Sequence, residues 1–181
     1  MRIFAGAAKG RTLIGPRGDA TRPFTGKARE AVFSILGGDI VGARVLDLYA
    51  GSGSLGLEAL SRGAAEAVFV ERGDKALDAL RRNVEAVALG GRIVAGDVAG
   101  FLRHHGGEHD IVFVDPPYAL GVDAVAEILG LVAPVVAAPG VVVVHRRAGT
   151  PMTLPTPGML IITEHRRYGE GEVWWLDKET R

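Results

Sequence analysis

The sequence contains no cysteine, and this absence excludes several kinds of protein at once. A disulfide-stabilised scaffold, a thiolate metal site and a cysteine nucleophile all require that residue. His104 and His105 stand beside two glycines and are typical of a loop. His145 follows four valines at the end of a predicted strand, where it could act as a base, although we favour a side chain that is satisfied by a local hydrogen bond. We therefore predict no metal site.

Long apolar segments are also missing. The longest one, 132–144, is interrupted by Pro134, Pro139 and Gly140 and is too short to span a bilayer. The first residues, MRIFAGAAKG, lack the apolar centre of a signal peptide. These features predict a cytoplasmic protein without membrane contact, and 181 residues suit one globular domain with a small appendage.

Net charge is absent as well, because 21 basic residues balance 21 acidic ones, but their distribution is uneven. The first thirty residues contain seven lysines and arginines and only two acids. Such a basic segment is a candidate contact for nucleic-acid phosphates, and a merely solvated surface is an equally good interpretation of the charge alone. The candidate nucleic-acid-binding residues are Lys9, Arg11, Arg22, Lys27 and Arg29.

From residue 43 onward, short β-branched runs alternate with longer amphipathic segments. The predicted strands are 43–50, 65–71, 92–97, 111–118 and 141–146, and the predicted helices are 54–63, 74–89, 98–104 and 121–132. This alternation predicts an α/β fold with a parallel sheet that is covered on both faces. A small hairpin is expected within 1–17, a helix at 25–36 and a closing hairpin at 159–177. We divide the chain into a basic N-terminal extension, 1–38, and a main domain, 39–181.

A glycine-rich turn of the form G-x-G-x-x-G follows the first strand of the alternating part and opens its first helix. Such glycines permit a tight turn and let a ligand approach the backbone and the free helix amides. Acids stand at the carboxyl ends of the first four strands, namely Asp47, Glu71, Asp97 and Asp115. Each alone is typical of a helix cap. Together they predict a cofactor containing a nucleoside, bound across strands one to three.

Two classes of cofactor fit this edge, a nicotinamide dinucleotide and S-adenosylmethionine. A dinucleotide pyrophosphate binds close to helix amides and away from carboxylates. Asp47 precedes the glycine turn, where its charge would repel a pyrophosphate but attract an ammonium or sulfonium group. We therefore favour S-adenosylmethionine.

The fourth strand runs into Asp115, Pro116, Pro117 and Tyr118, which we predict to be the catalytic residues. An exocyclic base amine is a weak nucleophile because its lone pair is delocalised, and two acceptors on its N–H groups would free that pair. The carboxylate of Asp115 and the carbonyl of Pro116 supply two acceptors, the prolines fix the backbone, and Tyr118 offers a ring for stacking a flipped base. This is catalysis by positioning and electrostatics. Strand termination is the plainer alternative.

The motifs DLYAGSGSLGLEALSRGA, FVE and FVDPPY, in this order, resemble the RsmD-type 16S rRNA guanine-N2 methyltransferases of bacteria. So do RIFAGAAKGRTL and TRPFTGKAREAVFSIL near the N-terminus, and the resemblance covers essentially the whole chain. It implies a Rossmann-like methyltransferase fold, a mostly parallel seven-stranded sheet with an antiparallel final strand. It also implies methylation of a guanine amine in 16S rRNA, either free or within the assembled small subunit. We expect a monomer.

The resemblance also implies residue roles. Asp47, Gly51 and Gly53 would border the methionine moiety of S-adenosylmethionine, Glu71 its ribose, and Asp97 with Val98 its adenine. The full predicted cofactor-binding set is Asp47, Tyr49, Gly51, Gly53, Glu71, Arg72, Asp97 and Val98. The chain departs from the family where a glutamate often follows the apolar run of the fifth strand, because His145 stands there.

Other activities fit parts of the pattern. A DNA adenine-N6 or cytosine-N4 methyltransferase would use the same acid-proline-proline-aromatic geometry, but no additional segment for reading a DNA sequence is evident. A non-catalytic nucleic-acid-binding module would not need the intact motif from Asp115 to Tyr118. An NAD-dependent oxidoreductase would need a substrate domain that we do not find. RNA methylation remains the leading hypothesis.

Overall fold

The computed structural model describes residues 1–16, 24–154 and 159–178, and its centre is one seven-stranded sheet. The strands are β1 (Arg44–Leu48), β2 (Glu66–Glu71), β3 (Arg92–Ala95), β4 (His109–Val114), β5 (Val136–Arg147), β6 (Leu160–Tyr168) and β7 (Gly171–Lys178). Their order is β3-β2-β1-β4-β5-β7-β6. The first five pair in parallel, and β7 is antiparallel to both of its neighbours. The predicted sheet with an antiparallel final strand is confirmed.

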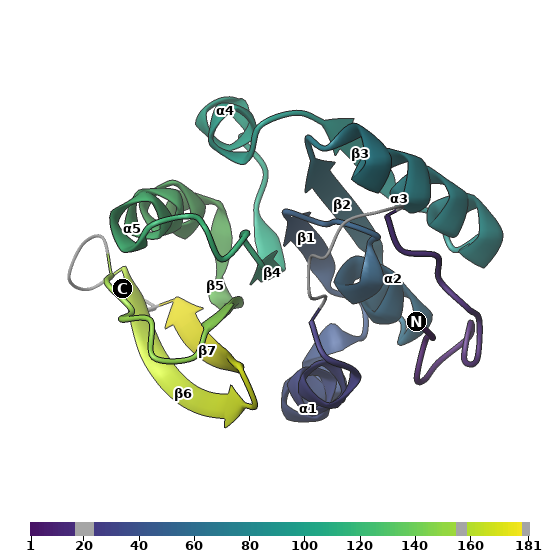
Figure 1. Cartoon of the computed structure of the whole chain (residues 1–181), viewed down its shortest axis with the longest axis horizontal. Coiled ribbons are helices and arrows are strands. Elements are labelled where there is room, and N and C mark those ends of the chain that lie inside the picture. Colours follow the sequence, from purple (N-terminus) through teal and green to yellow (C-terminus); the bar gives the residue numbers. More distant parts are fainter. Residues whose placement is uncertain (17–23, 155–158, 179–181) are drawn as a thin grey trace.

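Helices cover both faces of this sheet (Figure 1). They are α1 (Gly26–Leu36), α2 (Ser54–Ser61), α3 (Asp74–Val87), α4 (Val98–His104) and α5 (Val122–Val132), with 3-10 turns at Gly37–Ile40 and Ala133–Val135. One buried cluster joins the sheet to α1, α2 and α3, and a second joins it to α4 and α5. Successive strand residues point to opposite faces, so Val45 belongs to the first cluster and Leu46 to the second. This two-sided burial explains why the consecutive residues Val45 and Leu46 of β1 are both apolar.

β5 begins at Val136 rather than at the predicted 141. Val136 pairs with His109 at the start of β4, and the register then shifts so that Ile111 pairs with Val141. The irregular stretch of β5 between these pairs contains Pro139 and Gly140, residues that interrupt a regular ladder. Pro139 and Gly140, which interrupt the apolar run in the sequence, therefore lie within β5.

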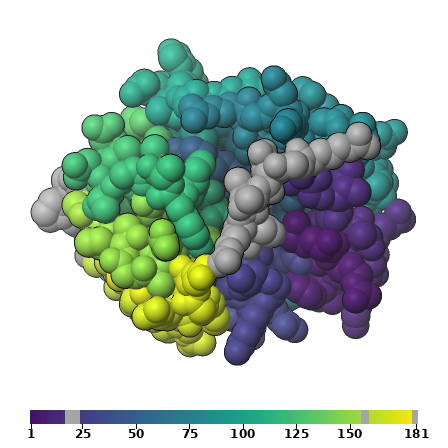
Figure 2. Space-filling view, in the orientation of Figure 1, coloured from purple at the N-terminus to yellow at the C-terminus, as the bar shows by residue number. Residues whose placement is uncertain are grey.

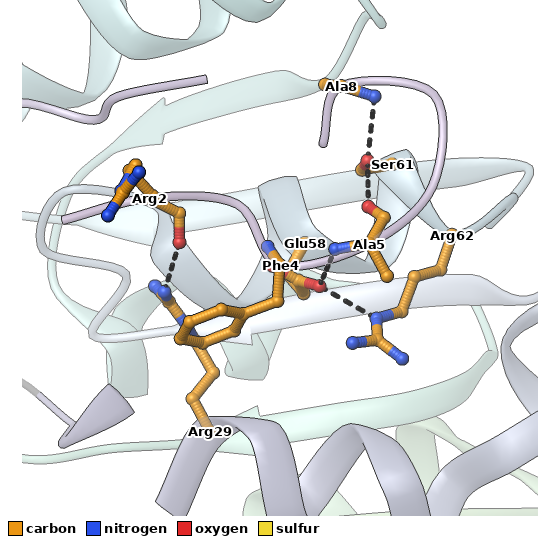
Figure 3. Close-up of polar contacts among 8 residues, drawn as sticks. All are labelled: Arg2, Phe4, Ala5, Ala8, Arg29, Glu58, Ser61 and Arg62. Atoms are coloured by element: carbon orange, nitrogen blue, oxygen red, sulfur yellow. Dashed lines mark hydrogen bonds and ion pairs between the residues drawn. The ribbon is translucent and has the colours of Figure 1, made fainter. Parts of the chain in front are cut away.

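The N-terminal segment, 1–16, folds back on itself as the predicted hairpin requires, but it forms no regular strands. Within it, the structure has a single isolated bridge, between Arg2 and Thr12. Around this bridge, Ile3 donates to the Arg11 carbonyl at 3.0 Å and Leu13 to the Met1 carbonyl at 2.7 Å. The backbone also bonds to α2, because Phe4 and Ala5 donate to the carboxylate of Glu58 at 2.8 and 3.1 Å (Figure 3). The segment also lies beside α3, as the space-filling view shows (Figure 2), where Arg11 donates to the Ala86 carbonyl. The division at residue 38 stays a prediction.

Within the described residues, no helix combines the length and the apolar character needed to cross a membrane.

Candidate active site

The predicted site residues of β1, β2 and β4 lie at one edge of the sheet. Leu48 pairs with Val70 of β2 and with Val114 of β4, so Tyr49, Glu71 and Asp115 follow side by side. Val114 in turn pairs with Val144 of β5, which places His145 beside Asp115. β3 ends next to Glu71, and Asp97 comes two residues after it. The register therefore brings acids from four strands to the edge where parallel sheets bind ligands.

Asp47 lies inside β1 and is 1% exposed. Its Oδ2 accepts a hydrogen bond of 2.9 Å from the backbone N–H of Gly56 in α2. Burial raises the pKa of Asp47 well above its ordinary value, and the charges of Asp115 and Glu71 raise it further. A cationic ligand group placed here would favour the ionised carboxylate.

Glu71 ties the glycine turn to the end of β2. Its Oε2 accepts from the N–H of Gly51 at 2.8 Å, and its Oε1 accepts from the N–H groups of Arg72 and Gly73 at 2.8 Å each. An ionised carboxylate has roughly four acceptor positions, so three donors leave capacity for one hydroxyl. The predicted ribose contact of Glu71 is compatible with this arrangement and stays a prediction.

Two glycines of the turn lie close against neighbouring side chains. A Cβ on Gly53, whose φ is +78°, would lie 2.4 Å from Cδ1 of Leu80, and a Cβ on Gly56 would lie 2.4 Å from the ring of Phe69. Gly51, with a φ of +57°, has no such close neighbour, since a Cβ there would come no nearer than 3.9 Å to another atom. The close approach of α2 to β2 and α3 thus accounts for Gly53 and Gly56 before any ligand is considered.

Tyr49, Arg72 and Asp97 gather at the side of the edge towards β3. Asp97 caps α4, accepting from the N–H of Gly100 at 3.0 Å, and its Oδ1 lies 3.8 Å from Nη1 of Arg72. Burial raises the pKa of Tyr49, and the charge of Asp97 adds to this. Val98 points into the buried cluster beneath α4, so its side chain is not available to an adenine. The cap that the sequence suggested for Asp97 is present, and the adenine contact stays a prediction.

The loop after β4 holds Asp115 and Tyr118 against β5. Oδ1 of Asp115 is 2.7 Å from Nδ1 of His145, and the hydroxyl of Tyr118 is 3.4 Å from Nε2 of the same ring. The Asp115 side chain is 27% exposed and Tyr118 is 37% exposed. Leu120 donates to the Pro117 carbonyl at 2.8 Å, which leaves the Pro116 carbonyl as the candidate acceptor of the loop.

This partner of Asp115 was not predicted from the sequence. We expected His145 to form a local bond, but its hydrogen-bonding partner is 30 residues away in the chain. The expectation was wrong because the contact is made across two parallel strands. One feature of the sequence could have indicated this contact, because a polar residue follows the apolar runs of both β4 and β5.

The predicted nucleic-acid-binding residues do not share one environment. Lys9, Arg11 and Lys27 are exposed, whereas Arg22 lies outside the described residues. Arg29 is 1% exposed, so its predicted phosphate contact is corrected. Its guanidinium donates to the carbonyl of Arg2 and lies 4.4 Å from the ring of Phe4 (Figure 3).

Burial lowers the pKa of Arg29, and the nearby carboxylate of Glu58 opposes that shift. Glu58 is itself buried and bonds to the N-terminal backbone and to Arg62. Arg29 therefore holds the N-terminal segment on α1 and α2 rather than facing a polyanion.

His105 and His109 form a second histidine contact, with their Nε2 atoms 2.8 Å apart. Burial, together with the charges of His105 and Arg44, lowers the pKa of His109 to about 4. This pair lies at the start of β4, the end opposite Asp115. Within the described residues, no group of three histidines or acids could hold a metal ion.

Comparison with known proteins identifies the family. A family model described as conserved hypothetical protein 95 matches residues 1–177. The chain belongs to this family. Ribosomal RNA small subunit methyltransferase D of Escherichia coli strain K12 is 43% identical over 122 residues, covering 67% of this chain and 62% of that protein. The match thus spans less than two thirds of the relative's length, and the resemblance to RsmD-type proteins is confirmed.

Solved structures give the same picture of the fold. The Escherichia coli protein yhhF is 34% identical, with a TM-score of 0.87 over 100% of this chain and 99% of that one. A hypothetical protein of Thermus thermophilus is 35% identical, with a TM-score of 0.82 over 97% and 98% of the two chains. The whole described sheet, including β6 and β7, therefore belongs to the shared architecture.

Proposed function

We propose that this protein transfers a methyl group from S-adenosylmethionine to the exocyclic N2 amine of a guanine in small-subunit 16S rRNA. Its kinship with ribosomal RNA small subunit methyltransferase D supports the rRNA substrate. The observation that carries the proposal is the placement of Asp115 and Tyr118, in one loop, next to the edge formed by Asp47, Glu71 and the glycine turn. A donor site and a base site then adjoin along β1 and β4.

The residues of β1 and β2 fit S-adenosylmethionine. Bound there, this cofactor supplies an electrophilic methyl group on a positively charged sulfur. Asp47 is a buried carboxyl group with a raised pKa and without a cationic partner among the described residues, which suits an ammonium or sulfonium neighbour. Glu71 fixes the turn through the N–H of Gly51, so the loop is shaped before ligand arrives.

The residues of the loop after β4 prepare the amine. Asp115 and the Pro116 carbonyl accept its two N–H groups, and Tyr118 stacks against the base. With the cofactor held at the adjoining site, the nitrogen lone pair would take up its methyl group, and the cofactor would leave as a neutral thioether. The amine then loses one proton to the Asp115 carboxylate, so the charges balance.

The exposed cations of the N-terminal part, Lys9, Arg11 and Lys27, are proposed to contact RNA phosphates. Arg11 also donates to the Ala86 carbonyl, which fixes its position beside α3. The RNA backbone would then lie across the N-terminal segment while the target base enters beside Tyr118. Association by this route is predominantly electrostatic and weakens with salt.

Methylation assays on defined RNA test the proposal. The substrates are 16S rRNA lacking the modification, free and assembled into small subunits, with S-adenosylmethionine labelled on its methyl group. We expect label in one of these substrates and none in duplex DNA. Labelling of DNA alone would favour the DNA methyltransferase hypothesis, and no transfer to either RNA form would overturn the proposed function.

A further inference from the structure

We infer that His145 is a positioning residue for methyl transfer, whose Nδ1–H holds one oxygen of Asp115 so that the other accepts from the target amine. This inference rests on the proposed function. The contact joins the end of β5 to the residue that follows β4. It concerns a residue that does not touch the base itself.

The imidazole of His145 is enclosed by three separate parts of the chain. Phe24, just before α1, packs on it with ring centroids 4.4 Å apart, and Tyr118 approaches from the loop after β4. On the side of β7, a Cβ on Gly171 would lie only 2.4 Å from Nε2. The ring thus fills its site, and a glycine is needed beside it. A side chain confined in this way holds its partner in one orientation.

The hydrogen-bonding pattern fixes the tautomer. An ionised Asp115 only accepts, so Nδ1 of His145, 2.7 Å from Oδ1, carries the proton. In the neutral ring Nε2 is then an acceptor, matching the hydroxyl of Tyr118 at 3.4 Å. The Asp115 bond is much the shorter of the two. His145 therefore acts mainly on Asp115.

One oxygen of Asp115 remains for the substrate. Among the described residues, Oδ2 has no hydrogen-bond partner, and the side chain keeps access to solvent. Rotation of the carboxylate would move this acceptor, and misplacement by about 1 Å can cost on the order of 100-fold in rate. The next residue, Arg146, donates to the Leu120 carbonyl at 2.6 Å. Consecutive residues of β5 therefore anchor both ends of the loop that carries the predicted catalytic group.

Paired substitutions separate positioning from simple packing. The amide nitrogen of asparagine reaches the place of Nδ1, whereas that of glutamine reaches the place of Nε2. We expect His145→Gln and His145→Ala to lower kcat by roughly 10-fold or more, with KM for rRNA and the Kd for S-adenosylmethionine changed less than about 2-fold. His145→Asn should recover most of the turnover. Equal loss in the asparagine and glutamine variants, or full turnover in the alanine variant, would overturn the inference.

A readout without substrate distinguishes failure of this inference from failure of the proposed function. In ¹⁵N-histidine-labelled protein, the Nδ1–H proton of His145 should resonate far downfield and should lose that position in Asp115→Ala. An unchanged resonance in that variant would refute the bond, whatever the activity. Absence of methyl transfer by the wild-type protein, with the resonance behaving as expected, would instead refute the proposed reaction alone.

Discussion

The two halves of the candidate site hold their acids in different ways. At the ends of β1 and β2, Asp47 and Glu71 accept hydrogen bonds from backbone N–H groups of the adjoining turns. At the ends of β4 and β5, Asp115 is held by a side chain, that of His145, and its other oxygen has no hydrogen-bond partner in the described part of the chain. We propose that the first arrangement is a fixed receptor for a ligand and that the second orients a reacting group. Substitutions in the two halves should therefore fail in different ways.

The largest effect is expected from Asp115→Ala. This change removes the acceptor of the amine, and we expect methyl transfer to fall by about 1,000-fold or more. Affinity for S-adenosylmethionine, measured by calorimetry, should stay within about 2-fold, because the ligands of the first half are intact. Substantial turnover in this variant would remove Asp115 from the mechanism.

The next largest effect is expected from Gly53→Ala, a substitution in the half of the site at the ends of β1 and β2. The new Cβ would lie 2.4 Å from Leu80 in a backbone conformation with φ of +78°, so we expect a loss of roughly 1–3 kcal/mol in the free energy of unfolding. Gly51→Ala is the matched control, since its Cβ meets nothing closer than 3.9 Å. Denaturant unfolding should rank Gly53→Ala well below Gly51→Ala, and equal losses would contradict the packing explanation.

Asp47→Asn should separate stability from binding. The raised pKa means that the folded protein retains a proton that the unfolded chain has released, so stability falls as pH rises between those two pKa values. Asparagine still accepts from Gly56 but carries no charge. We expect the ligand-free variant to melt about 2–4 °C higher at neutral pH, as for a gain of ~1 kcal/mol.

The same variant should bind S-adenosylmethionine more weakly, because the counter-charge for its cationic groups is gone. The stability difference should vanish below pH 3.8, the ordinary pKa of an aspartate. Melting curves across pH, with and without cofactor, measure both effects. An Asp47→Asn variant that is less stable than the wild type at neutral pH would contradict this prediction, because it would show that the charge of Asp47 does not destabilise the folded protein.

The smallest effect is expected at the N-terminal segment. Lys9→Ala with Lys27→Ala should weaken RNA association a few-fold and reduce the slope of log affinity against log salt by about 1 to 2. Arg29→Lys is a useful contrast, because Arg29 is buried and should affect unfolding rather than the salt slope. RNA affinity that is unchanged across a salt titration would make these exposed lysines a solvated surface only.

Whether a feature could be predicted from the sequence depends on whether its contacts are local or distant in the chain. The α/β sheet, the glycine turn and the position of Glu71 at the end of a strand follow from residues close together in the chain, and the structure has these elements as predicted, whereas the ribose contact of Glu71 stays a prediction. The contact between Asp115 and His145 depends on the register of β4 and β5, which the sequence leaves open.

The N-terminal errors have a related cause. Arg29 looked like a surface cation because neighbouring residues are basic, but Phe4 and the carbonyl of Arg2 surround its guanidinium. The hairpin expected at 1–17 is reduced to one isolated bridge with a few backbone hydrogen bonds around it, and the neighbouring N–H groups of Phe4 and Ala5 donate to Glu58 of α2. Both features depend on tertiary packing against α2 rather than on local pattern.

The central claim is that Asp115 and its loop activate the N2 amine of a guanine. The most direct measurement is mass spectrometry of nucleosides released from 16S rRNA that has been methylated by the wild-type protein with isotope-labelled S-adenosylmethionine. We expect labelled N2-methylguanosine at a single position. Label in N6-methyladenosine or N4-methylcytidine instead would contradict the claim.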